Sequence, residues 1–213
     1  MKKSKDLTNA NANRRRFLAA MGAGAGLWAL PHRLHATDAI GSITELTGRA
    51  TADRGGSEIT LEVGTGIAVR DLIRTGTRSF LTMRFGDQTS MRLGEETELL
   101  IDRYLLEVQG SFDLANGALV FDRPEEAVKT PTTVRTVFGQ LGVRGTRFFA
   151  GPSQDVFGVF VDRGQLDVTA AGITQSLGPG DGVDIDAPGD PASEVAQWGQ
   201  GRIDAAFASV MPG

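Results

Sequence analysis

The sequence predicts an all-β domain, a two-layer β-sandwich that is jelly-roll-like or partly solenoidal, followed by a short C-terminal helix. Glycine accounts for 28 of the 213 residues, and it recurs between short segments rich in valine, leucine, phenylalanine and threonine. This spacing is typical of many short strands separated by turns. No helical periodicity interrupts residues 41–186, so parallel strands linked by helices are not expected.

The clearest strands form a hairpin around Gly86. Residues 81–85 alternate apolar and polar side chains, residues 90–93 do the same, and Gly86-Asp87-Gln88 supplies the turn between them. Alternation with a period of two gives each strand one buried and one wet face. The pattern recurs in four later segments, residues 119–121, 157–161, 166–168 and 183–185.

The pattern changes after residue 186. Ser193 can cap a short helix that runs through Trp198, and Gly199 and Gly201 interrupt this helix. Beyond them, an apolar face of helical spacing is formed by Ile203, Phe207 and Val210. This face either docks a partner or packs on the chain's own β domain, and packing is the favoured interpretation.

Residues 1–36 have the three parts of a secretory signal peptide, which are a basic head, a short apolar stretch and a small-residue cleavage site after Ala36 or Ala39. The apolar stretch at 17–30 has 14 residues, whereas a membrane span needs about 20, so no stable span is expected. The signal read by the bacterial twin-arginine translocase is similar to the run of Arg14, Arg15, Phe17 and Leu18. This translocase is the expected partner during export to the periplasm. An uncleaved basic tail is the alternative.

Cleavage of this signal peptide, the leader, would remove most of the chemically reactive side chains. The mature chain keeps 15 basic and 25 acidic residues, a net charge of −10, which argues against nucleic acid as a partner. The sequence has no cysteine, and both histidines, His32 and His35, lie in the leader. Disulfides, histidine-based nucleophile systems and thiolate or imidazole metal sites are therefore excluded. We expect no catalytic residue, no metal and no cofactor.

Several short segments occur in a characteristic order. They are residues 69–76, 79–93, 117–121, Lys129-Thr130-Pro131, residues 143–148 and residues 159–164. This order resembles the FecR domain, the periplasmic module of regulators that sense iron-siderophore uptake. The resemblance divides the chain into the signal peptide at 1–36, a FecR-like β domain at 40–186 and a helical tail at 187–213.

The resemblance implies an all-β domain that passes a signal by contact with other proteins. In such regulators a cytoplasmic segment binds an extracytoplasmic-function sigma factor, a membrane helix follows, and the region beyond the β domain meets the signalling domain of an outer-membrane transporter. Here 13 residues precede the paired arginines. Regulation of a sigma factor for iron-siderophore uptake therefore ranks below the other functions considered.

The candidate contact for a ligand or partner is Arg144-Gly145-Thr146. A guanidinium beside a glycine suits a carboxylate or a sugar that approaches closely. The alternative is structural, with Gly145 in a tight bend and Arg144 paired with an acid. Oxygen-rich aspartates at 181, 184, 186 and 190 could hold a hard cation, but a solvated acidic edge is the favoured interpretation.

The sequence thus predicts a non-enzymatic periplasmic domain that senses a protein or ligand in envelope signalling, with another envelope protein as partner. A module that binds cell-wall glycan is the alternative, through arginine and exposed aromatics such as Tyr104. Glycoside hydrolysis needs two carboxylates, and the candidates are Glu95, Glu96, Glu98, Glu125 and Glu126. Adjacent strand residues point to opposite faces, so neighbouring glutamates do not form a catalytic pair.

Overall fold

The computed structural model describes residues 39–212, apart from 87, 106–108, 125 and 128–130. The expected signal peptide, with Arg14, Arg15, Phe17 and Leu18, lies outside the described residues, as do Glu125 and Lys129-Thr130. Within the described part of the chain, no helix has both the length and the apolar character to cross a membrane.

The described residues form sixteen strands and one short helix. The strands are β1 (Gly41–Thr47), β2 (Ala50–Arg54), β3 (Ser57–Thr60), β4 (Gly66–Ile67), β5 (Leu72–Thr75), β6 (Phe80–Phe85), β7 (Ser90–Leu93), β8 (Glu98–Leu105), β9 (Gln109–Asn116), β10 (Leu119–Asp122), β11 (Thr132–Thr136), β12 (Gln140–Ser153), β13 (Val156–Ala170), β14 (Ile173–Leu177), β15 (Asp181–Ile185) and β16 (Ala196–Gln197). The helix is α1 (Gln200–Ala208). The predicted all-β class and the short C-terminal helix are confirmed.

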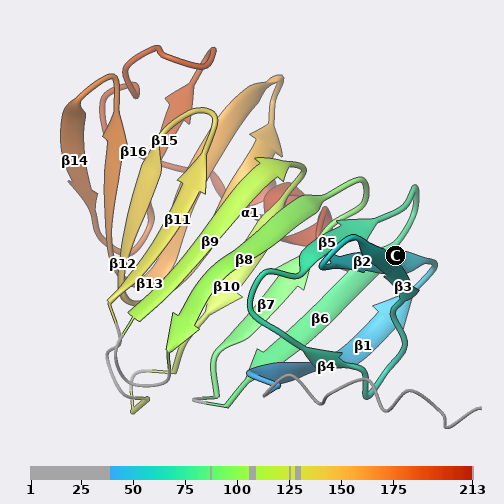
Figure 1. The fold of residues 1–213 in the computed structure, drawn as a ribbon. Helices are drawn as coiled ribbons and strands as arrows, with labels where there is room; N and C mark the ends of the chain where they lie inside the picture. The colour runs from blue at the N-terminus through green and yellow to red at the C-terminus, as the bar shows by residue number, and fades with distance from the viewer. Residues whose placement is uncertain (1–38, 87, 106–108, 125, 128–130, 213) are drawn as a thin grey trace, which may run out of the picture. The chain divides into compact units, whose positions relative to one another are not determined.

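Hydrogen-bonded ladders join all of these strands into one curled sheet (Figure 1). Its main path runs β3-β2-β5-β8-β9-β11-β12-β10-β7-β6-β1-β4, and β13 branches from β12 to carry β14, β15 and β16. The apolar side chains of nearly every strand meet in a single cluster, which we call the main core. The division into two separate layers stays a prediction, because a continuous ladder connects the strands.

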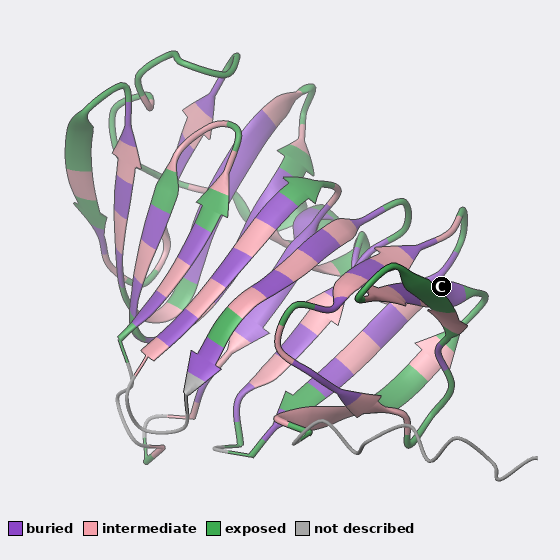
Figure 2. Ribbon diagram, viewed as in Figure 1, coloured by how far each residue is buried: buried purple, intermediate pink, exposed green. Residues whose placement is uncertain are grey.

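The predicted hairpin around Gly86 is confirmed as β6 and β7. The strands are antiparallel, with Leu81 opposite Leu93 and Met83 opposite Met91. These four side chains are buried, and the intervening residues are partly or fully exposed, which gives the alternating bands along the strands in Figure 2. Apolar alternation in the sequence therefore fixed which face of this hairpin enters the core.

One strand pair in the sheet is parallel. β9 and β11 run side by side with Asp113 opposite Arg135. The described residues between them contain β10 and no helix, in line with the lack of helical periodicity. Arg135 donates hydrogen bonds to Asp113 and to Asp102 of β8, so that one guanidinium ties three neighbouring strands together. This contact lowers the pKa of Asp102 below its ordinary value.

β12 and β13 form a long hairpin that is covered on both faces. Phe148 and Ala150 enter the main core, whereas Phe149 points to the opposite face beside Phe160 of β13. There it meets α1 in a second cluster, which we call the helix core, formed by Ala118, Val120, Phe149, Phe160, Ala206 and Val210.

The helix begins later than the sequence suggests. We expected a helix from Ser193 through Trp198, but that expectation is wrong: Ala196 and Gln197 form β16, and α1 starts after Gly199 and contains Gly201. The Ser193 hydroxyl accepts a hydrogen bond from the Asp184 N–H instead of capping a helix. The apolar face of Ile203, Phe207 and Val210 does pack on the chain's own sheet, as favoured.

Trp198 accounts for this arrangement, because its indole packs closely against the sheet. Gly158 and Gly182 leave room for the indole: a β-carbon at Gly158 would come within 2.7 Å of the indole ring, and one at Gly182 would overlap it. The indole stacks on Phe160 with ring centroids 5.3 Å apart. The Arg202 guanidinium lies 3.6 Å from the centroid of the indole ring and is held by Asp184 in a two-pronged ion pair.

Candidate functional site

The expected contact residues Arg144, Gly145 and Thr146 lie at a bulge in β12. The strand register with β13 shifts between Arg144 and Arg147, and Gly145 has a φ of 64°, which glycine adopts readily. Thr146 is fully buried, and its hydroxyl donates to the Gln165 carbonyl at 2.7 Å. Gly145 is buried as well. Of the three residues, Arg144 alone is placed to meet an incoming molecule.

The Arg144 side chain is 71% exposed. Its Nη2 lies 3.3 Å from Asp167 Oδ2, and it stands at the rim of a depression of about 460 Å³ lined by Thr132, Thr133 and Val143. A guanidinium carries five N–H donors in a fixed fork, so one ion pair leaves donors for a carboxylate or a sugar hydroxyl. The geometry is compatible with the expected contact, whose role stays a prediction.

A second concave site lies at the turn between β11 and β12. We call it the apolar groove; it has a volume of about 360 Å³ and is lined by Leu114, Val137, Phe138, Val156 and Phe157. Val137 is 57% exposed. The rings of Phe138 and Phe157 stack with centroids 4.4 Å apart, which gives the groove a rigid aromatic wall. Val137 continues the apolar lining of the groove out to its rim, and a contiguous apolar surface of this kind is typical of a contact site.

The rim of the apolar groove is acidic. Asp155 and Asp186 line it, and neither carboxylate has a cationic partner among the described residues. Residues 150–213 as a whole contain nine Asp or Glu residues and two arginines, and both arginines pair with acids. The groove therefore lies in an excess of negative charge that favours a cationic partner.

The acidic residues at 181, 184, 186 and 190 do not converge on one point. Asp184 binds Arg202, Asp181 accepts from the Gln197 side chain and the Gly178 N–H, and Asp186 faces the apolar groove. Within the described ranges, no three carboxylates or imidazoles are grouped closely enough to hold a metal ion.

Three of the candidate glutamates are tied to separate partners. Glu95 accepts from the Arg78 N–H, Glu96 from the Thr77 hydroxyl and Glu98 from Arg74. These contacts order the loop before β8 and the first residue of β8. They do not place two of these carboxylates opposite each other across a cleft.

Tyr104 is not an exposed aromatic. It is 3% exposed and stacks on Phe85 with ring centroids 4.8 Å apart, so the expectation that it presents a face to glycan is wrong. Strict alternation along β8 would place Tyr104 on the face opposite Ile101. The strand register shifts between Ile101 and Arg103, so the Tyr104 ring enters the main core as Ile101 does.

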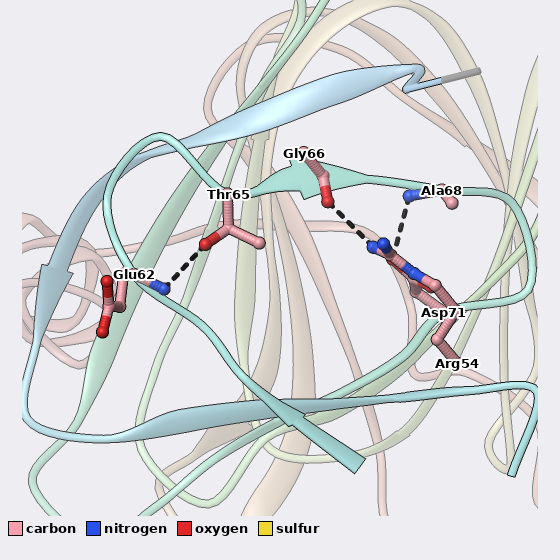
Figure 3. Close-up of polar contacts among 6 residues, drawn as sticks. All are labelled: Arg54, Glu62, Thr65, Gly66, Ala68 and Asp71. Carbon is pink, nitrogen blue, oxygen red and sulfur yellow. Dashed lines mark hydrogen bonds and ion pairs between the residues drawn. The ribbon is translucent and has the colours of Figure 1, made fainter. Parts of the chain in front are cut away.

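A buried ion pair holds the loop that leads into β5 (Figure 3). Asp71 is 1% exposed, and both of its oxygens accept from Arg54, at 2.8 Å from Nε and 2.7 Å from Nη2. Arg54 also donates to the Gly66 carbonyl, and Asp71 accepts from the Ala68 N–H. The hydrogen bonds to Asp71 raise the pKa of Arg54. This pair holds together the end of β2, the start of β4 and the residue before β5, and we call this part of the sheet the corner.

Neither the Arg54–Asp71 pair nor the apolar groove was expected from the sequence. The pair joins residues 17 apart, which become neighbours only because β2 pairs with β5 in antiparallel register. The sequence did contain a signal for the groove, because Val137 and Phe138 are two large apolar residues directly before a glycine in a turn. Such residues in a turn have no core of their own and either cover a neighbouring strand or meet a partner.

The comparisons with known proteins agree with this fold. The chain is similar to two crystal structures of a protein from Parabacteroides distasonis that is designated a candidate anti-sigma factor. The TM-scores are 0.53 and 0.52, each with 16% sequence identity over 64% of this chain. The match covers 64% and 63% of those chains, less than two thirds of their length. No curated protein matches the sequence.

A family model adds the residues that carry the likeness. It is described as FecR protein, and it aligns from Asp71, the buried acid of the corner, to Asp167, the partner of Arg144. The matched stretch therefore includes β5 to β12 and most of β13. Residues 71–167 of this chain match the FecR protein family.

Proposed function

We propose that this chain is an exported, non-enzymatic FecR-like domain that takes part in envelope signalling by binding another protein. The apolar groove carries the proposal, since it combines an exposed valine, a stacked aromatic wall and two carboxylates that have no cationic partner among the residues the structure describes. The match to the FecR family supports a regulatory role. The expected partner is an envelope protein that presents an apolar side chain next to a lysine or arginine.

Site-specific photocrosslinking in the host cell tests the groove. With Val137 replaced by the photoreactive residue benzoylphenylalanine, illumination is expected to give one predominant crosslinked protein. Val63 is the matched control, because it is also an exposed valine, 63% accessible, but lies in the turn after β3. Adding Asp155→Lys to the Val137 probe is expected to reduce the yield at least severalfold, because it reverses the charge of the rim.

Equal crosslinking from Val63 and Val137, or none from either, would contradict the proposal. Fractionation of the same cells tests the export. Recovery of the crosslinked protein from the periplasm supports an envelope partner, whereas recovery of the full-length precursor from the cytosol would exclude it and favour a sigma factor as partner.

Cell-wall glycan is the second candidate, and the exposed Arg144 beside its depression is the observation that favours it. If glycan is bound there, the protein pellets with purified peptidoglycan, and Arg144→Ala abolishes pelleting. Arg84→Ala is the control, because Arg84 is an exposed arginine on β6, away from the depression. A protein that stays in the supernatant excludes this candidate.

A further inference from the structure

The described sheet has four strands with a neighbour on one side only, and one of them is unprotected. β4 and β16 are two residues long, and β3 carries Glu58. Short edge strands and edge charges are the usual means of preventing strand addition. β14 has neither: its five residues, Ile-Thr-Gln-Ser-Leu, include no charge and no proline, and four of them are at least partly exposed.

The backbone geometry shows which groups of β14 face outward. Ala171 and Gly172, both with positive φ, form a two-residue turn that joins Ala170 to Ile173. In such a hairpin the flanking pair is hydrogen-bonded and the pairs then alternate. Ile173 and Gln175 therefore bond to β13, while the N–H and C=O groups of Thr174 and Ser176 point away from the sheet. No other described strand pairs with β14.

The side chains of this edge are already ordered. The hydroxyls of Thr174 and Thr169 are 2.8 Å apart, and Ser176 donates to Asp167 at 2.6 Å. On the other face, the Gln175 amide donates to the carbonyls of Ala192 and Ser193. Adding a strand here would cost little further side-chain ordering.

We propose that β14 pairs with the β14 of a second copy of this chain, antiparallel and across a two-fold axis at Gln175. In this register Thr174 of one copy lies opposite Ser176 of the other, and both outward pairs of backbone groups are satisfied, giving four hydrogen bonds. The strand is its own complement, which is the condition for an interface of this symmetry.

Two further observations favour a second copy as the occupant. The chain is acidic, so two copies repel where charged surfaces meet, and β14 is an edge without charge where they can approach. Ile173 is 56% exposed although it lies on the same face of the strand as buried Leu177. The two-fold register brings it opposite Leu177 of the second copy, which covers its exposed surface.

Sedimentation equilibrium of the purified protein tests the dimer. We expect a concentration-dependent monomer–dimer equilibrium, and Thr174→Pro is expected to raise the dissociation constant at least about tenfold, because it removes one outward N–H from each copy. Thr60→Pro is the matched control, since Thr60 is an exposed, uncharged residue of edge strand β3 and its N–H points outward by the same alternation. It should leave the dissociation constant unchanged.

A cysteine variant tests the register. The chain has no cysteine, so Gln175→Cys introduces one thiol per copy. The two Cα atoms of a non-hydrogen-bonded antiparallel pair lie about 4.5 Å apart, within the range that a disulfide spans. Mild oxidation should link Gln175→Cys copies severalfold faster than Thr174→Cys copies. A protein that is monomeric at all concentrations, a dimer that is insensitive to Thr174→Pro, or equal linking rates would each overturn the proposal.

Discussion

Replacing Trp198 with alanine is expected to lower the free energy of unfolding by about 3 kcal/mol, the usual cost of deleting a large packed aromatic. The indole bridges Phe160, the Arg202 guanidinium and the glycines beneath it, so its loss leaves a void between α1 and the sheet. Phe149 would lose a ring neighbour as well. Urea denaturation followed by circular dichroism measures the change.

Two companion variants show whether the packing of the indole is responsible. Gly182→Ala should destabilise the protein although it adds a methyl group, since that carbon overlaps the indole. Val195→Ala should have little effect, because Val195 is 39% exposed. If Trp198→Ala costs no more than Val195→Ala, the indole does not anchor the helix.

Replacing Asp71 with alanine is expected to cost about 2–4 kcal/mol. Removal of one member of a buried ion pair leaves the other charge without compensation, and here it also leaves the buried Ala68 N–H without its acceptor. The cost falls at the lower part of the usual range, because the Arg54 side chain is 28% exposed and can reach water.

An exposed pair provides the comparison for Asp71→Ala. Arg74 and Glu98 approach as closely, at 2.7 Å, but their side chains are 42% and 37% exposed. Glu98→Ala should therefore change the urea midpoint little, whereas Asp71→Ala should shift it clearly. Equal shifts would show that burial of Asp71 contributes nothing to the strength of the pair.

The fold class was predictable because it depends on local patterns. Alternation placed Leu81, Met83, Met91 and Leu93 in the core, and the frequent glycines marked the turns. The order of strands in the sheet was not predictable, because the parallel pairing of β9 with β11 and the branching at β12 join segments by long-range contacts. Local periodicity carries no information on such pairings.

The helix was misplaced for a related reason. Gly199 and Gly201 weaken a helix in isolation, and residues 193–198 lack them. The packing of Trp198 on Gly158 and Gly182 favours the strand at residues 196–197, and tertiary contacts outweigh the intrinsic preference. Of the candidate site residues, Arg144 is exposed as a contact requires, while Thr146 is buried and bonded within the domain.

The double coverage of β12 and β13 determines where the molecule can open. Around Phe149 and Phe160 the hairpin has the main core on one side and α1 on the other, and its amide hydrogens there should be the last to exchange with solvent. β14 pairs with β13 at one edge of the same hairpin, and most of its residues are exposed. The domain can therefore fray at this edge, or pair with a further strand there, while its centre remains folded.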